Sequence, residues 1–284
     1  MQSSALLETV NRAAELFHWV ADPEPALFDN PPQGRLKVGV DLGTAYLTVA
    51  VLDEQDQPVT GEYQFAQVAR DGLVVDFVGA VDLVRSMKDR IERRIGRELT
   101  HAASGYPPGV PGVEVQATSH VVEAAGMICT SLVDEPTAAN ALVKLENGVI
   151  VDVGGGTTGI AVVENGQVVY TADEATGGTH FSLVIAGAHN IPFEEAETLK
   201  IDPSRQPVLF PVIKPVLEKV ASIVARHIEG YQVPEIALVG GSSAFYRAAE
   251  VIEEYTGIPT WVPPHPALVT PIGMAMNNNP EDYA

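Results

Sequence analysis

The chain has 284 residues, and 46% of them are hydrophobic, which is enough for a buried core without disulfides or structural metals. Its formal net charge is −20, because 37 acidic side chains oppose 17 basic ones. This excess of negative charge excludes nucleic acid and anionic membranes as expected partners. An anionic ligand would have to be held by backbone amides and a metal ion rather than by a basic surface.

The single cysteine, Cys129, lies in the apolar run GMICTSLV. We therefore expect a buried thiol, no disulfide, and a reducing, cytoplasmic setting. The sequence has no run of about 18 apolar residues, which a membrane-spanning helix would need. It also lacks the basic and apolar pattern of a secretory signal at its start.

The first predicted element is an amphipathic helix over residues 3–20, capped by Ser3 or Ser4. Its apolar positions recur at spacings of three and four, which places them on one face; they are Leu6, Val10, Ala13, Phe17 and Val20. Residues 21–34 contain four prolines and predict an extended linker. Two interpretations stay open: the helix packs on its own domain, or it is a docking tag for a partner.

The next segments alternate between strands and helices. A strand is expected up to Gly43, and two more over residues 46–66 with a turn near 53–58. Apolar spacing predicts a helix that ends at Gly96. Strands are then expected at residues 99–109 and 128–136, a helix at 113–127, and another helix that begins at Thr137.

The segment VDVGGGTTGIAVVENGQVV contains the pattern G-x-G-x-x-G, which is typical of dinucleotide sites when a helix follows it. Here β-branched residues and the pair Asn165-Gly166 predict a hairpin instead. We therefore exclude a Rossmann site. The pattern also repeats, since Asp41 and Gly43 match Asp152 and Gly154, with the same offsets afterwards. A repeat of this size indicates two homologous domains.

Both repeats place an Asp-x-Gly turn between two strands. Glycine and small hydroxyl residues leave backbone N–H groups open to a phosphate chain. The first turn is Asp41-Leu42-Gly43-Thr44, and the second runs from Asp152 to Thr157. The two carboxylates suit Mg²⁺ that is held through its waters.

Five motifs in order resemble the superfamily of actin, DnaK chaperones and sugar kinases: VGVDLGT, DEPTAANAL, VDVGGGTTGIAVV, IALVGGSSAFYRAAEVI and PHPALVTPIGMAM. The resemblance covers residues 36–277. It implies an α/β protein with two ribonuclease-H-like (actin-like ATPase) domains around a nucleotide cleft. Residues 1–35 would form the helix and linker, 36–145 with 267–284 domain I, and 146–266 domain II.

The resemblance also implies ATP and Mg²⁺ as cofactors. Asp41 and Asp152 would order the waters of the metal, and Glu135 would polarise the attacking water, unless it only caps a helix. The nucleotide would be bound by Gly43, Thr44, Gly154, Gly155, Gly156, Thr157, Gly177, Gly178, Glu197, Lys200, Gly240, Gly241 and Ser242. His180 is expected to pack a turn rather than act in catalysis.

Some positions depart from the superfamily pattern. Thr48 stands where actin has a lysine in its first phosphate loop. No other lysine can be assigned to that role, and Lys88, on a predicted helix, is expected to be solvated. Without a lysine on the γ-phosphate, ATP hydrolysis is expected to be slow or absent.

Within the superfamily, the phrases VGVDLGTAYLTVAVLDE, GRELTHAASGYPPG and PVIKPVLEKVASIVARHI resemble the EutJ family of ethanolamine utilization. That family is chaperone-like and encoded with bacterial microcompartment genes. It implies a chaperone or reactivating factor, with a shell or cargo enzyme as partner of the N-terminal helix. The alternatives are a self-associating scaffold or filament former that binds ATP or ADP, and a small-molecule kinase with Asp134 as its base.

Overall fold

The computed structural model describes residues 3–70 and 73–279. The chain divides into two compact units, the first made of Met1–Lys144 with Leu268–Ala284 and the second of Leu145–Ala267. Residues 1–2, at the start of the predicted helix and linker, and residues 280–284, at the end of predicted domain I, lie outside the described residues.

Unit 1 is built on a six-stranded sheet with the order β1-β4-β3-β2-β7-β8. Its strands are β1 (Phe17–Trp19), β2 (Leu36–Leu42), β3 (Tyr46–Asp53), β4 (Pro58–Phe65), β7 (His101–Tyr106) and β8 (Ile128–Asp134). β2, β3 and β4 form an antiparallel meander, whereas β2, β7 and β8 run parallel. The parallel strands therefore bring their carboxyl ends to one edge of the sheet. β5 (Ala69–Arg70) and β6 (Leu73–Val74) pair in antiparallel fashion as a separate two-stranded sheet.

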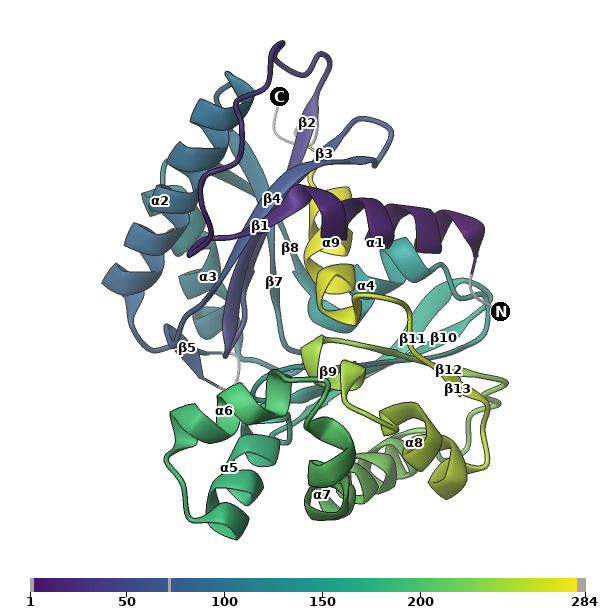
Figure 1. The fold of residues 1–284 in the computed structure, drawn as a ribbon. Coiled ribbons are helices and arrows are strands. Elements are labelled where there is room, and N and C mark those ends of the chain that lie inside the picture. The colour runs from purple at the N-terminus through teal and green to yellow at the C-terminus, as the bar shows by residue number, and fades with distance from the viewer. Residues whose placement is uncertain (1–2, 71–72, 280–284) are drawn as a thin grey trace. The chain divides into compact units, whose positions relative to one another are not determined.

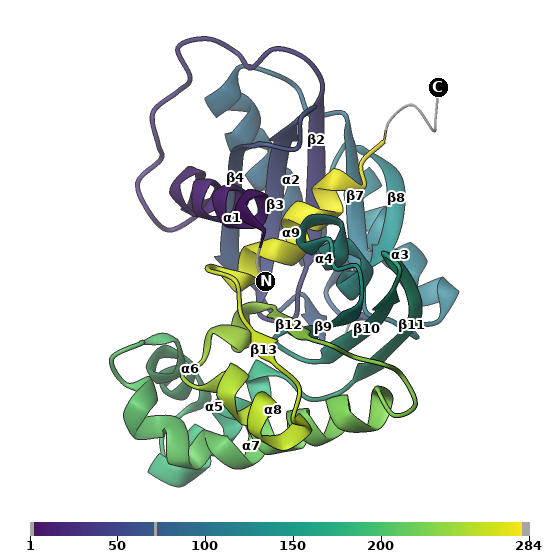
Figure 2. The ribbon, with the colours of Figure 1, turned by 90° about the vertical axis from the view of Figure 1, so that its right-hand side faces the viewer.

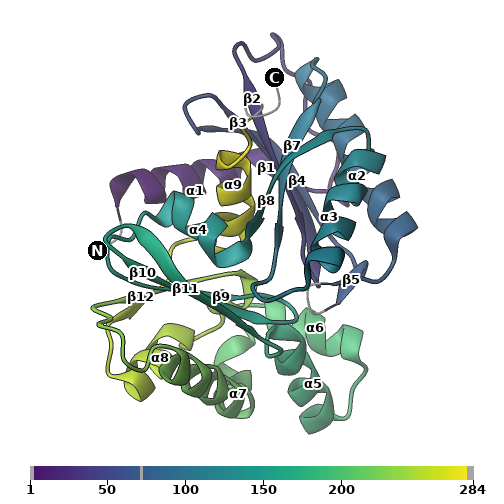
Figure 3. The same ribbon diagram turned by 180° about the vertical axis from the view of Figure 1, so that it is seen from behind.

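Helices cover both faces of this sheet. α2 (Phe77–Ile95) and α3 (Gly112–Ala124) lie on one face (Figure 3), and α1 (Ser4–Leu16), α4 (Glu135–Val143) and α9 (Val269–Met276) lie on the other (Figure 1). α2 ends as predicted at Gly96, which adopts the left-handed conformation with φ 67°. α9 lies against β2 so closely that a Cβ on Gly39 would come within 2.5 Å of the Pro271 carbonyl oxygen.

The N-terminal helix is shorter than predicted. Ser3 caps it as expected, because its Oγ accepts a hydrogen bond from the Leu6 N–H at 3.1 Å. The helix ends at Leu16, however, and residues 17–19 leave it to pair in parallel with β4 as strand β1. Phe17, His18 and Trp19 favour a strand once an edge is available. The interpretation in which this helix packs on its own domain is the one that the structure has.

Unit 2 contains a five-stranded sheet with the order β11-β10-β9-β12-β13. Its strands are β9 (Gly148–Val153), β10 (Thr158–Glu164), β11 (Gln167–Glu174), β12 (Ile236–Val239) and β13 (Thr260–Trp261). β9, β10 and β11 form an antiparallel meander, and β12 runs parallel to β9. The glycine run is thus followed by a hairpin that turns at Asn165-Gly166, as predicted. The repeat is also confirmed, because both sheets contain the same three-stranded meander with an Asp-x-Gly sequence at the end of its first strand, β2-β3-β4 in unit 1 and β9-β10-β11 in unit 2.

The helices of unit 2 are α5 (Gly178–His189), α6 (Phe193–Ile201), α7 (Gln206–His227) and α8 (Ala248–Thr256), with the 3₁₀ turns η1 (Gly241–Ala244) and η2 (Pro266–Leu268), the second of which crosses into unit 1. Apolar residues of α7 pack against β9, β10 and β12. A second apolar cluster joins α5, α6, α7 and α8 around Phe181. Figure 2 shows these four helices on one side of the unit 2 sheet. This cluster fixes the start of α5 and the inner face of α6 next to the glycine-rich turn.

Candidate functional site

The first predicted phosphate loop is the turn between β2 and β3 in unit 1. Asp41 is the second-to-last residue of β2 and pairs in register with Thr48 of β3. A side chain at Gly43 would bring its Cβ to 2.6 Å from the Tyr46 carbonyl oxygen, so the tight turn requires glycine there. Gly43 and Thr44 are half-buried, whereas Thr48 is 5% exposed.

The start of α4 lies at the same sheet edge, because β8 ends beside β7 with Tyr106 opposite Asp134. The helix begins at Glu135, two residues before the predicted start at Thr137. Asp134 caps it, since its Oδ1 accepts the Thr137 N–H at 3.0 Å. That hydrogen bond gives Asp134 a structural role at the start of α4. Glu135 is the first helical residue and is half-buried.

The second predicted phosphate loop is the turn between β9 and β10 in unit 2. Asp152 is 6% exposed and pairs in register with Val239 of β12. The Gly154 N–H donates to the Thr157 carbonyl at 3.0 Å and closes the turn. Gly154 and Gly155 remain half-buried, and Gly156 and Thr157 are buried. The loop is therefore a short turn closed by a hydrogen bond, and its three glycines leave mainly backbone atoms at its surface.

The start of α5 is tied to this loop. The N–H groups of Gly178 and Thr179 donate to the carbonyls of Gly154 and Gly155 at 2.9 and 2.7 Å. A Cβ on Gly177 would lie 2.8 Å from the same two carbonyl oxygens, so the two backbones touch. His180 accepts the Gly177 N–H on its Nδ1 at 3.3 Å, which is the expected turn-packing role.

Glu197 and Lys200, both 9% exposed, project from α6 toward the start of α5. Lys200 Nζ donates to Glu197 Oε2 at 2.7 Å and to the Gly178 carbonyl at 3.2 Å. Ser182 Oγ donates to the same Glu197 oxygen at 2.5 Å. Burial lowers the pKa of Lys200, and the Glu197 charge opposes that shift.

The turn after β12 completes the cluster. Gly240 has φ 84°, and a Cβ there would overlap the Asp152 carboxylate and lie 2.6 Å from the Val153 carbonyl oxygen. Ser242 Oγ donates to the Gly154 carbonyl at 2.8 Å. Gly241, between them, is exposed. The loop after β9, the loop after β12 and the start of α5 are thus bound to one another.

Unit 2 therefore brings together the nucleotide residues predicted for it: Asp152, Gly154, Gly155, Gly156, Thr157, Gly177, Gly178, Glu197, Lys200, Gly240, Gly241 and Ser242. Unit 1 brings Asp41, Gly43, Thr44 and Glu135 to one edge of its own sheet. Ser182 was missed by the sequence reasoning. A serine four residues after Gly178 carries no motif, and only its contact with Glu197 gives it a place in the cluster.

Two observations in unit 2 fit a bound nucleotide. Glu197 Oε1 is buried and has no hydrogen-bond partner among the described residues, so an acceptor is left for a hydroxyl or amino group. Gly154 and Gly241 have open space where a Cβ would stand, beyond contacts at 3.5 and 3.7 Å. Among residues 3–70 and 73–279, no three His, Cys, Asp or Glu side chains converge as metal ligands. A magnesium ion would therefore depend on water and phosphate for most of its ligands.

The expectation that Lys88 is solvated was wrong. Its side chain is buried on α2, and Nζ pairs with Glu92 Oε1 at 2.7 Å. This ion pair therefore links two successive turns of α2. Cys129 is buried and free, as expected. Burial raises the pKa of its thiol to about 11.

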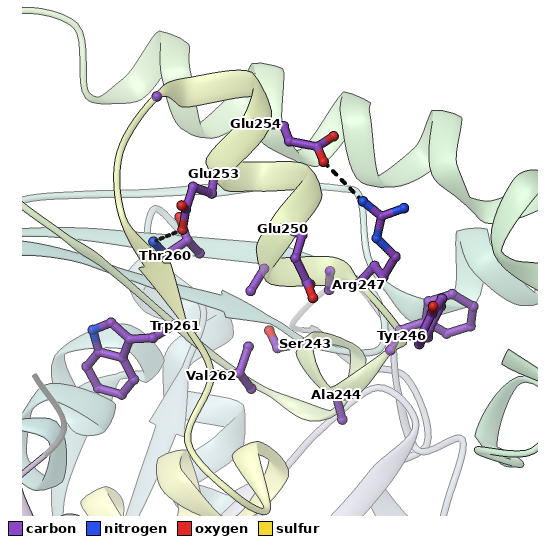
Figure 4. A pocket seen from close by; sticks show the side chains of 14 residues that line it. Ser243, Ala244, Tyr246, Arg247, Glu250, Glu253, Glu254, Thr260, Trp261 and Val262 are labelled. Carbon is purple, nitrogen blue, oxygen red and sulfur yellow. Dashed lines mark hydrogen bonds and ion pairs between the residues drawn. The ribbon is translucent and has the colours of Figure 1, made fainter. Parts of the chain in front are cut away.

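A groove of about 850 Å³ lies close to the turn after β12, between η1, α8 and β13 (Figure 4). None of the predicted site residues lines it. Two of its carboxylates are already engaged. Glu253 Oε2 accepts the Thr260 N–H, and Glu254 pairs with Arg247, each at 3.0 Å. These contacts hold the edge strand β13 and the start of α8 in place.

The sequence of the chain matches several known proteins. The family model of type IV pilus assembly protein PilM matches residues 80–269. Ethanolamine utilization protein EutJ of Salmonella typhimurium is 44% identical over 257 residues, which cover 88% of this chain and 87% of that protein. A chaperone HscA homolog of Chromobacterium violaceum is 32% identical over 124 residues, which cover 40% of this chain and 20% of that protein.

Solved structures also resemble this chain. The crystal structure of EutJ from Carboxydothermus hydrogenoformans has a TM-score of 0.88 and 45% identity, and the match covers 96% of this chain and 99% of that one. A PilM–PilN complex has a TM-score of 0.69 at 14% identity, over 87% of this chain and 99% of that one. MreB5 of Spiroplasma citri bound to AMPPNP has 0.70 at 18%, over 86% and 96%.

These last two likenesses concern the fold, and they confirm the predicted class of two ribonuclease-H-like domains. No helix among the described residues is both long and apolar enough to cross a membrane. The chain belongs to the EutJ family of ethanolamine utilization proteins, and it also matches the PilM family model over residues 80–269.

Proposed function

We propose that the chain binds ATP and ADP together with Mg²⁺. The carrying observation is the cluster in unit 2, where three backbone turns meet around Gly154 and leave Glu197 Oε1 as a buried acceptor. MreB5 of Spiroplasma citri, which has this fold, was solved with AMPPNP and with ADP. The fold alone is shared at that identity, so the assignment rests on the residues of this chain.

In this proposal the turn from Gly154 to Thr157 holds the phosphates through backbone N–H groups, as does Gly43-Thr44 in unit 1. A magnesium ion would neutralise phosphate charge. Asp152 and Asp41 would orient its waters, because each lies at the end of a strand next to its loop. Glu135, at the amino end of α4, is proposed to orient the attacking water.

The nucleoside would lie along Gly240, Gly241 and Ser242. Glu197 Oε1 would accept a hydrogen bond from a ribose hydroxyl. Lys200 is held by Glu197 and the Gly178 carbonyl, and so it contributes mainly by fixing that carboxylate. Ligands that touch the loops of both units would favour one arrangement of the units over others, which is how binding would drive domain closure.

We further propose a chaperone-like or reactivating role in ethanolamine utilization, associated with the microcompartment. Membership in the EutJ family and the HscA likeness of part of the chain support this role. Hydrolysis would be slow, since Thr48 occupies the lysine position of actin and is buried in β3. Lys88, paired with Glu92, offers no substitute.

A second candidate is a nucleotide-dependent scaffold. The PilM family model covers residues 80–269, and a PilM was solved in complex with PilN. In such a protein, nucleotide would set the conformation that a partner recognises, without turnover.

Phosphate release by the full chain, with and without an ethanolamine-degrading enzyme, separates the two roles. A client machine should release phosphate faster when the enzyme is added, and Glu135→Gln should abolish the increase. The exposed Glu254→Gln serves as the control, because its carboxylate pairs with Arg247 away from both loops. ATP-dependent sedimentation without any phosphate release would favour the scaffold instead.

A further inference from the structure

Residues 3–19 form an arm, α1 followed by β1, that packs on β4. Leu6, Val10 and Ala13 of α1 are buried. β1 is only three residues long and occupies the end of the sheet, where it pairs with β4 through Phe17–Gly61, His18–Glu62 and Trp19–Tyr63. Without the arm, β4 would be the exposed edge of the sheet.

The part of β4 that the arm covers, residues 61–63, is here called the seat, and its shape is specific for the arm. Phe17 packs directly on the backbone of Gly61, where a Cβ would come within 2.8 Å of the ring. Trp19 packs edge-on against Tyr63 and Tyr46, with centroids 5.4 and 5.8 Å away. On the opposite face of β4, Glu62 is 2% exposed and pairs with Arg90 and Arg94 of α2. The position of β1 along β4 is therefore fixed by Phe17 on Gly61 and by the aromatic contacts of Trp19.

The arm is joined to the sheet by a long connection. Residues 20–35 contain no helix or strand, and four of them are proline. Figure 2 shows this connection as a wide loop outside the sheet. Its far end is held by Arg97, whose Nη1 donates to the carbonyls of Pro32 and Gly34 at 2.7 Å each. If these contacts open, the connection reaches about 50 Å at ~3.3 Å per residue.

We propose that this arm exchanges between two copies of the chain, so that α1 and β1 of one copy pair with β4 of the other. The occupant of the seat is then a second copy of the same chain. The seat is already shaped for this segment, through Gly61 under Phe17 and the two tyrosines around Trp19. Exchange reproduces every arm contact, so the closed and exchanged forms differ mainly in the connection and in chain concentration. This inference is independent of nucleotide binding.

Cysteines at register partners test the exchange in the full chain. Trp19 and Tyr63 face each other on neighbouring strands, which lie about 4.8 Å apart and so permit a disulfide. One preparation carries Trp19→Cys and the other Tyr63→Cys. They are mixed at rising concentration with oxidised glutathione and followed by non-reducing electrophoresis. The expected result is a disulfide-linked pair that contains one chain of each kind, in an amount that rises with concentration.

Two controls fix the interpretation. A chain with both cysteines should close its disulfide internally when dilute, which shows that the pairing geometry is correct. Gly61→Val should abolish both disulfides, because the added side chain takes the place of the Phe17 ring; circular dichroism then checks that the rest of the sheet survives. Internal closure without any mixed pair overturns the proposal, and so does failure of internal closure.

The connection offers a further readout. Arg97→Ala frees the end of the connection and should raise the initial rate of mixed-disulfide formation severalfold. Arg85→Ala is the matched control, since Arg85 is another arginine that donates to a backbone carbonyl, that of Ala124, away from the connection. Equal rates for the two variants would overturn the role given to the connection.

Discussion

The buried pair Glu197–Lys200 yields the sharpest stability prediction. In Glu197→Gln the shape of the side chain is kept, but Lys200 loses its counterion at 2.7 Å while the Gly178 carbonyl remains. Removing one partner of a buried ion pair costs about 3–5 kcal/mol. Because both side chains keep a little exposure, we expect the lower end, about 3 kcal/mol.

The double variant Glu197→Gln/Lys200→Met removes both charges and fills the space with an apolar chain. It should recover most of that loss, which leaves a deficit of about 1 kcal/mol from the Ser182 hydrogen bond. Nucleotide binding should not recover fully, because the glutamine amide has one acceptor oxygen where the Glu197 carboxylate has two, one for Ser182 and one for the nucleotide. Stability and binding are thereby separated.

Urea unfolding followed by tryptophan fluorescence measures the effect in the correct unit. The chain has two tryptophans, and Trp261 is the one in unit 2, so a Trp19→Phe background reports unit 2 alone. A loss under about 1 kcal/mol for Glu197→Gln would refute the buried pair. A double variant that is as unstable as the sum of the single variants would refute the coupling.

Three other predictions concern single residues. Gly257 has φ 72° and open space around it, so Gly257→Ala should lower the free energy of unfolding by about 1 kcal/mol. Gly240→Ala, at φ 84°, should lower it by at least about 1 kcal/mol more, because the added Cβ overlaps Asp152. Equal urea midpoints for the two variants would contradict this. Burial raises the pKa of Cys129 from 9.0 to about 11, so stability is full below pH 9 and falls as pH rises toward 11; a Cys129→Ala chain should lose that decline in an alkaline denaturation series. Burial and, to a smaller extent, the charge of Arg94 lower the pKa of His18, and the charges of Glu62 and Asp22 oppose this shift. Docking of the arm should therefore weaken as pH falls below 6.5. Hydrogen exchange of α1, corrected for intrinsic rates, should show this weakening in the wild type and lack it in His18→Asn.

Much of the fold follows from local signals in the sequence. The Asn165-Gly166 pair and the β-branched residues around it define the hairpin, and Gly96 ends α2, because both signals act within a few residues. The offsets from Asp41 and from Asp152 predict the two meanders for the same reason. The glycine-rich turns were found by spacing, and the geometry then explains Gly240 through its approach to Asp152.

The errors arise where distant residues decide the structure. Residues 17–19 left the helix because β4 offers an edge for pairing, and nothing near Phe17 in the sequence announces that strand. Lys88 is buried because Glu92 neutralises it under the neighbouring elements, which helical spacing does not disclose. Ser182 joins the cluster only through α6, which folds back onto α5.

The central claim is that Asp152 serves a nucleotide through a metal ion, and calorimetric titration of ATP into the full chain tests it directly. With Mg²⁺ present, Asp152→Asn should bind at least about tenfold more weakly than wild type, a difference of about 1.4 kcal/mol. With EDTA in place of Mg²⁺ it should bind no more weakly, because a carboxylate near bare phosphates only repels them. Glu164→Gln, at the exposed end of β10, removes a charge from the same unit as the control. Equal affinities of Asp152→Asn and wild type in Mg²⁺ would contradict the site.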